Sequence, residues 1–157
     1  MADMKILAIG KIQKMYEPAQ EEFLKRLTRY TKCRLIELDD EQAPERLSEN
    51  EKLAVQNAEW EKIRKKLSPG DFLVLLDSTG KKMNSVAFSQ KIEGWQEKKD
   101  VTFALGGSLG FPPAAFERAD FVLSFSDMTF THSMARVILL EQIYRGFKIM
   151  KGEPYHK

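Results

Sequence analysis

Five short apolar runs, separated by helix-like segments, constrain the fold of this chain more than any other feature. The runs cover residues 4–10, 34–38, 72–76, 101–105 and 120–125. Strands that alternate with helices through short connections form a parallel sheet with helices on both faces. We therefore predict a single α/β domain over residues 1–157, with a mainly parallel sheet of five to six strands.

The segments between the runs carry helix and turn signals. Ser48 and Glu51 have the spacing of a capping box and predict the start of a helix. Pro112 and Pro113 predict the start of a short helix, and the last helix is expected from about Ser133 to Met150. The segment DSTGKK (77–82) is typical of a turn.

Composition excludes several classes of protein. No apolar run approaches the roughly 18 residues that a membrane span needs, so we expect no membrane association. A single cysteine, Cys33, cannot form an internal disulfide and favours a reducing, cytoplasmic compartment. Two distant histidines and one cysteine form no recognisable metal-ligand cluster, so no metal is expected. The net charge of +2 permits a polyanionic partner without requiring one.

The stretch ALGGSLGF (104–111) places a glycine corner directly after a predicted strand. It matches neither the dinucleotide fingerprint, because Ser108 stands where a glycine is needed, nor the phosphate-binding P-loop. Gly106 and Gly107 would let a ligand approach the backbone closely. The alternative is a turn with a purely structural role.

The loop SFSDMTF (124–130) follows the next predicted strand and contains no glycine or proline. A solvent-exposed loop would be expected to contain more turn-forming residues. Phe125, Met128 and Phe130 instead favour a loop that folds inward and lines an apolar cavity with backbone donors. Neither this loop nor the glycine corner contains lysine or arginine, so a flat base with a polar tail fits better than a phosphate.

The last predicted helix is apolar around more than half of its circumference, over residues 134–150. A surface helix of a monomer usually has a narrower apolar stripe. One face could pack on the sheet and the other on a second subunit across a two-fold axis. Alternatively, another element of the same chain could cover it.

The segments ALGGSLG, LSFSDMTFTHSMARVILLEQIYRGFKI and PYHK together resemble the large-subunit ribosomal RNA methyltransferase H family. This family belongs to the SPOUT superfamily of trefoil-knotted methyltransferases. The resemblance covers the whole chain and implies a C-terminal knot, a homodimer with an active site shared between subunits, and S-adenosyl-L-methionine as methyl donor. It also implies that the substrate is N3 of a pseudouridine in 23S rRNA of the assembled ribosome, and not DNA. The implied cofactor-binding positions are Leu76, Gly106, Phe125, Ser126, Asp127, Met128, Thr129 and Phe130.

The catalytic residues are less defined by the sequence. Arg145, Tyr155 and His156 are candidates on the substrate side, because an aromatic ring can stack on a base and a neutral histidine can accept a proton. Arg145 could instead pair with Glu141 one helical turn away. His132 is expected to cap or pack, and Asp127 could either cap its loop or accept hydrogen bonds from the ligand.

Two other functions are compatible with the same order of elements. A flavodoxin-like nucleotide-binding module would need a phosphate loop after the first strand, where GKIQKMY (10–16) is poor in glycine. A dimeric protein that binds ribosomes without catalysis is the other alternative. Methyl transfer and binding of S-adenosylmethionine distinguish the three functions.

Overall fold

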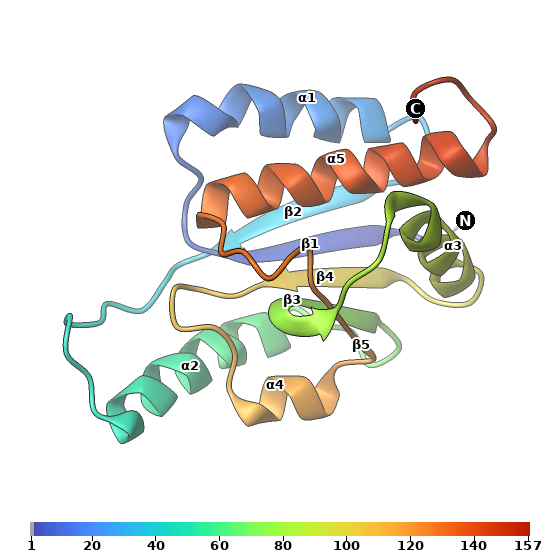
Figure 1. The fold of residues 1–157 in the computed structure, drawn as a ribbon. Helices are drawn as coiled ribbons and strands as arrows, with labels where there is room; N and C mark the ends of the chain where they lie inside the picture. Colours follow the sequence, from blue (N-terminus) through green and yellow to red (C-terminus); the bar gives the residue numbers. More distant parts are fainter. Residues whose placement is uncertain (1) are drawn as a thin grey trace.

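The structure is a computed structural model that describes residues 2–157, and its centre is one parallel sheet of five strands. The order across the sheet is β2-β1-β4-β3-β5, so the single α/β domain predicted from the sequence is confirmed (Figure 1). All four strand pairings are parallel. The strands are β1 (Met4–Ile9), β2 (Cys33–Leu38), β3 (Phe72–Lys81), β4 (Val101–Leu105) and β5 (Phe121–Leu123).

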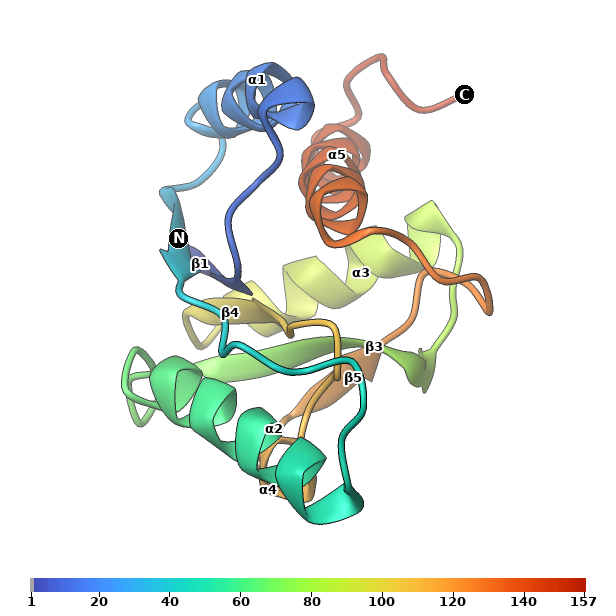
Figure 2. The ribbon, with the colours of Figure 1, turned by 90° about the vertical axis from the view of Figure 1, so that its left-hand side faces the viewer.

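Helices cover both faces of the sheet, as the sequence predicts (Figure 2). One face carries α1 (Glu17–Leu27), α3 (Ser85–Gln96) and α5 (His132–Met150), and the other carries α2 (Glu49–Arg64) and α4 (Pro113–Arg118). A short 3-10 helix, η1 (Lys14–Tyr16), precedes α1. No described helix has the length and apolarity that a membrane span requires.

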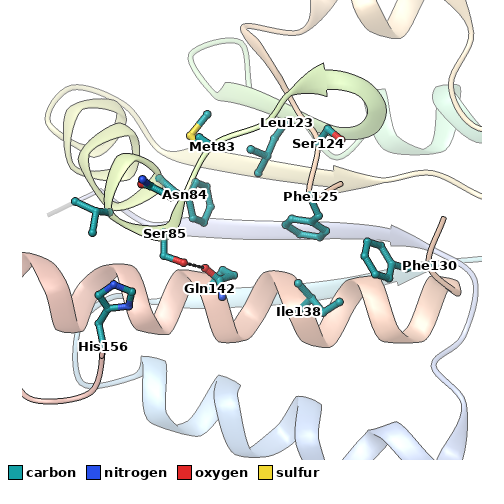
Figure 3. Close-up of a pocket in the computed structure, with 12 residues that line it drawn as sticks. Met83, Asn84, Ser85, Leu123, Ser124, Phe125, Phe130, Ile138, Gln142 and His156 are labelled. Atoms are coloured by element: carbon teal, nitrogen blue, oxygen red, sulfur yellow. Dashed lines mark hydrogen bonds between the residues drawn. The ribbon is translucent and has the colours of Figure 1, made fainter. Parts of the chain in front are cut away.

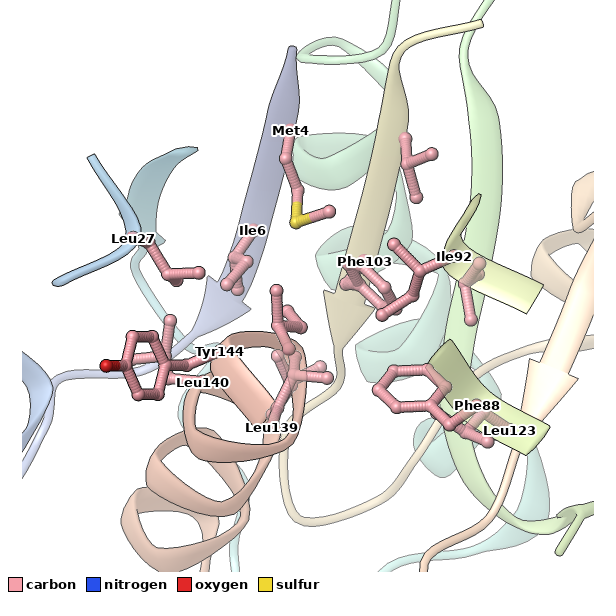
Figure 4. Close-up of a cluster of buried hydrophobic side chains, with 14 of the residues drawn as sticks. Met4, Ile6, Leu27, Phe88, Ile92, Phe103, Leu123, Leu139, Leu140 and Tyr144 are labelled. Carbon is pink, nitrogen blue, oxygen red and sulfur yellow. The ribbon is translucent and has the colours of Figure 1, made fainter. Parts of the chain in front are cut away.

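Two apolar clusters hold the layers together, because successive side chains of a strand point to opposite faces. Ile6 and Phe103 lie in the cluster under α1, α3 and α5, whereas Leu7 lies in the one under α2 and α4. Figure 4 shows the first cluster, in which Leu139 of α5 and Phe88 of α3 meet the strands. The central strands are therefore buried on both sides, which is why their sequences are continuous apolar runs.

The capping box predicted at Ser48 is confirmed. The Ser48 hydroxyl accepts a hydrogen bond from the Glu51 backbone N–H at 3.1 Å, and the Ser48 N–H donates to the Glu51 carboxylate at 3.2 Å. These two bonds satisfy donors that the first turn of α2 would otherwise leave free.

The turn predicted over residues 77–82 is wrong, because β3 continues to Lys81. The pairing with β5 shifts in register after Leu76 and resumes where Lys81 pairs with Leu123. Gly80 permits this path, since a Cβ atom there would lie 2.7 Å from the backbone of Val122 and Leu123. Leu76 and Lys81 thus stand opposite the same residue, Leu123, so the end of β3 curls back beside β5 (Figure 1). The knot itself stays a prediction from the resemblance.

The apolar surface of α5 is mostly covered by the same chain. This helix lies between α1 and α3 (Figure 2), and Leu139, Leu140, Ile143 and Phe147 are fully buried. Burial within the chain, one of the two explanations open from the sequence, therefore accounts for most of its apolar width. Val137 and Ile138 remain only partly covered.

Candidate functional site

The carboxyl ends of β3, β4 and β5 surround a cavity of about 240 Å³, which we name the strand-end cavity. Ligands of parallel α/β sheets bind at this edge. Seven of the eight cofactor positions implied by the resemblance line it: Leu76, Gly106, Phe125, Ser126, Met128, Thr129 and Phe130.

The loop after β5 is held in shape by its own hydrogen bonds. The Ser124 hydroxyl donates to the Ser126 carbonyl at 3.0 Å, and the Met128 backbone N–H donates to the Ser126 hydroxyl at 3.1 Å. The rings of Phe125 and Phe130 meet edge to face, with centroids 6.5 Å apart. The loop folds inward and presents aromatic faces and backbone groups to the cavity, as expected from its composition.

Asp127 is the one implied cofactor position that does not line the strand-end cavity. Its side chain is largely exposed and forms an ion pair with Lys82. The carboxylate thus turns away from the cavity toward a lysine that follows β3. The sequence suggested that Asp127 caps its loop or accepts hydrogen bonds from the ligand; the ion pair with Lys82 is neither of these roles.

Asp77 is not among the cofactor positions implied by the resemblance, although it lines the cavity. It is the one charged side chain among the described lining residues, and its carboxylate accepts a hydrogen bond from the Thr79 N–H at 3.0 Å. A negative group without lysine or arginine suits a cationic ligand better than a phosphate.

The two adjacent glycines of the corner make room for protein side chains. A Cβ atom on Gly106 would lie 3.3 Å from the Phe111 ring, and one on Gly107 would lie 2.7 Å from the Glu59 carboxylate. Gln56 of α2 also donates a hydrogen bond to the Leu109 carbonyl at 2.7 Å. Packing against Phe111 and α2 therefore requires these glycines, and both also line the strand-end cavity, so their contact with a ligand stays a prediction.

A second cavity of about 480 Å³, the helix cavity, adjoins the first. It lies between the start of α3, the loop after β5 and α5 (Figure 3). Four residues line both cavities: Leu123, Ser124, Phe125 and Phe130. Two ligands bound in the two spaces would therefore share one wall.

The chain after α5 folds back onto that helix and brings together the three substrate-side candidates. The Tyr155 hydroxyl donates to the Glu141 carboxylate at 2.8 Å, and Arg145 pairs with the same carboxylate at 2.9 Å. Arg145 also lies over the Tyr155 ring and contacts His156 Nδ1 at 3.2 Å. His156 lines the helix cavity, whereas Arg145 and Tyr155 do not. The pair with Glu141, which the sequence offers as the alternative to a substrate-side role for Arg145, is present.

His132 packs at the start of α5, as expected. It contacts the guanidinium of Arg136, a fully buried side chain that forms an ion pair with Glu37 and donates to the Gly10 carbonyl at 3.1 Å. Burial and the Arg136 charge lower the pKa of His132, although Glu37 acts in the opposite direction. This cluster joins the ends of β1 and β2 to α5.

No group of three or more candidate metal ligands occurs within residues 2–157. The polar and aromatic groups at the two cavities are aromatic rings, backbone groups, hydroxyls, the amides of Asn84 and Gln142, the Asp77 carboxylate and the His156 imidazole. These groups can hold and orient an uncharged or cationic organic ligand.

Comparison with known proteins shows the protein family to which the chain belongs. A sequence model described as "Predicted SPOUT methyltransferase" matches residues 2–156. A solved structure, a probable methylase family protein from Haemophilus influenzae, has the same fold with a TM-score of 0.57 and 12% identity, covering 96% of this chain and 67% of that one. The chain therefore belongs to the SPOUT methyltransferase family.

More similar relatives carry one particular name, ribosomal RNA large subunit methyltransferase H. The protein from Acetivibrio thermocellus is 48% identical over 97% of this chain and 98% of its own length. Those from Carboxydothermus hydrogenoformans and Enterococcus faecalis are 46% and 42% identical, over 99% and 98% of this chain and 99% of each relative. The resemblance found in the sequence is thus confirmed.

Proposed function

We propose that this protein is a methyltransferase that transfers the methyl group of S-adenosylmethionine to N3 of a pseudouridine in 23S rRNA of the assembled ribosome. The proposal includes a cytoplasmic homodimer with an active site shared between subunits. The observation that carries it is the pair of adjoining cavities at the carboxyl edge, in a chain that belongs to the SPOUT family. The shared name of its relatives supports rRNA as the substrate.

The strand-end cavity would hold the adenosyl group of the methyl donor. Phe125 and Phe130 offer apolar faces to the adenine, and the backbone of the loop offers donors and acceptors. Asp77 supplies a negative charge that suits a sulfonium cation. The ligand has no phosphate, which agrees with the lack of lysine and arginine among the described lining residues.

The target base would enter the helix cavity, next to the wall that the two cavities share. Methyl transfer to nitrogen is an in-line displacement, so the contribution expected of the protein is to hold N3 behind the methyl group. The proton of N3 must leave before or during transfer. Within the described residues, the groups beside a base in the helix cavity belong to α3, to α5 and to His156.

The hydrogen bond of His156 bears on its role. A guanidinium only donates, so His156 Nδ1 accepts from Arg145, and the neutral imidazole then carries its proton on Nε2. In this arrangement His156 donates to the substrate, for example to a uracil carbonyl, and does not accept the N3 proton. Arg145 and Tyr155 would hold the tail in place through Glu141.

The test is methyl incorporation from labelled S-adenosylmethionine into ribosomes from a strain that lacks this protein, with the product base identified by mass. His156→Ala should reduce turnover and leave calorimetric affinity for S-adenosylmethionine unchanged. Lys99→Ala, an exposed change between α3 and β4, is the matched control and should retain full activity. Ribosome binding without methyl incorporation by the unaltered protein would favour the non-catalytic alternative.

The acceptor should be the assembled ribosome and not free rRNA. With a net charge of only +2, the chain as a whole offers little electrostatic attraction to RNA, so we propose that the ribosome supplies the shaped surface that selects one base. Turnover on ribosomes should exceed turnover on naked rRNA at the same base concentration. Equal rates on both substrates would contradict this part of the proposal.

A further inference from the structure

The helix cavity is lined by a side-chain amide whose orientation is fixed by its neighbours (Figure 3). Gln142 of α5 donates through Nε2 to the Glu141 carboxylate at 2.8 Å, and its Oε1 accepts from the Ser85 hydroxyl at 2.6 Å. A carboxylate can only accept, so turning the amide over would place two acceptors against each other. Glu141 therefore holds the Gln142 amide in one orientation and leaves its second Nε2 hydrogen for another partner.

A second amide, that of Asn84, lines the same cavity and caps α3. Its Oδ1 accepts a hydrogen bond from the Ala87 backbone N–H at 2.8 Å. The cap uses the oxygen of the amide and leaves its Nδ2 hydrogens available to a ligand. Asn84 is exposed, so a ligand that enters the cavity from solvent can reach it.

The helix cavity is thus rich in N–H donors, while its amide and imidazole acceptors are already in use. Asn84 Oδ1, Gln142 Oε1 and His156 Nδ1 each accept a hydrogen bond from the protein. No Asp, Glu, Lys or Arg occurs among the described lining residues. Neutral donors without a charged acceptor suit a ligand edge with carbonyl oxygens. The N3 edge of a uracil-type base is of this kind, because a carbonyl flanks N3 on each side.

We propose that Gln142 and Asn84 donate hydrogen bonds to the carbonyl oxygens of the target base and so stabilise the anion that the base becomes when N3 loses its proton. This inference rests on the proposed function, because it needs the base in the helix cavity. The N3–H bond breaks and its proton passes to water. N3 then bonds to the methyl carbon with its electron pair, and the electron pair of the carbon–sulfur bond stays on sulfur. The carbonyl oxygens share the charge of the anion, so donors at these oxygens favour its formation.

The charged groups next to this cavity have partners of their own. Glu141 pairs with Arg145 at 2.9 Å, and Lys82, which precedes α3, pairs with Asp127. His156 lines the cavity, but its Nδ1 accepts from Arg145. None of these groups is placed to accept the N3 proton, so loss of this proton should depend on the pH of the solution and on the two amides.

The dependence of turnover on pH tests the inference. Asn84→Asp replaces the Nδ2 donor by an acceptor and keeps the helix cap, because Asp and Asn are equally good at this position. Turnover on ribosomes near pH 7 should fall about tenfold, as expected for loss of one hydrogen bond. It should recover at higher pH, with the midpoint of the pH profile raised by about one unit. Gln142→Glu, which can still accept from Ser85, should shift the profile in the same direction.

Three controls separate this effect from others. Asn84→Ser keeps a neutral cap and should also shift the profile, which excludes the added charge as the cause. Ser48→Asp adds a negative charge at the N-cap of α2, away from the helix cavity, and should leave the profile unchanged. The melting temperature of Asn84→Asp and the calorimetric affinity of each variant for S-adenosylmethionine should match those of the unaltered protein.

Two results would overturn the inference. One is a pH profile of Asn84→Asp and Gln142→Glu that coincides with that of the unaltered protein. The other is a loss of turnover that is equal at every pH, because damage to the structure would produce this result without any role of the donors. If the unaltered protein transferred no methyl group to ribosomes at any pH, the proposed function itself would fail.

Discussion

Gly80→Ala should destabilise the protein strongly, because the new methyl group would meet backbone and not a movable side chain. The Cβ atom would lie 2.7 Å from the carbonyl carbon and oxygen of Val122 and from the carbonyl carbon of Leu123. Ordinary contacts of a Cβ atom begin at about 3.4 Å, so β3 and β5 must separate locally. The adjacent hydrogen bond, from the Ser124 N–H to the Lys81 carbonyl at 3.0 Å, would be strained.

The magnitude follows from two contributions. Overpacking costs about 1–3 kcal/mol, and one backbone hydrogen bond contributes about 0.5–1.5 kcal/mol net. The free energy of unfolding should therefore fall by about 2–4 kcal/mol. At about 2–4 °C per kcal/mol, the melting temperature should fall by about 4–16 °C.

Urea denaturation at fixed protein concentration, followed by the fluorescence of Trp60 and Trp95, measures the change. Gly94→Ala is the matched control, because Gly94 is exposed within α3 and no atom lies within 4 Å of its added methyl group. That variant should gain about 0.5–1 kcal/mol from the lower entropy of its unfolded state. Equal stability of the Gly80→Ala variant and the unaltered protein would refute the close approach of β3 to β5.

Three further outcomes are expected. Burial and Arg136 lower the pKa of His132, so the unfolded chain takes up a proton at this residue more readily than the native protein does. The free energy of unfolding should therefore fall as the pH drops below about 6.5. In melting curves, the melting temperature of His132→Gln should fall less on acidification than that of the unaltered protein. Burial raises the pKa of Cys33 to about 12, so a thiol reagent at pH 8 should label it only after denaturation, and rapid native labelling would contradict this. Ser48→Ala should lower the free energy of unfolding by about 1 kcal/mol in urea titrations, whereas an unchanged midpoint would argue against the capping box.

The strands and helices could be predicted because their local signals agree with their packing. Three of the five apolar runs become the central strands β1, β3 and β4, and the Ser48–Glu51 spacing becomes a capping box. The end of β3 could not be predicted, because Ser78, Thr79 and Gly80 are typical turn residues. Only the proximity of β5 explains why the strand continues there.

Only those parts of the candidate site that have a local sequence signal could be predicted. The loop 124–130 has an apolar pattern that indicates an inward fold, and this pattern is local. Glu59 has no such signal, because it lies in a helix with many charged residues and resembles any solvent-exposed glutamate. Its burial depends on the glycine corner about fifty residues later in the chain, which sequence periodicity does not connect to α2.

The strand order also has a consequence for how the chain reaches its native state. Strand β4 lies between β1 and β3, both of which precede it in the chain, so it must enter a gap that the earlier strands leave open. Met4 pairs with Val101, and β5 joins β3 only after β4 and α4 have been made. Contacts between such distant segments slow folding. Newly synthesised chains should therefore complete their sheet late, after most of the polypeptide has left the ribosome that made them.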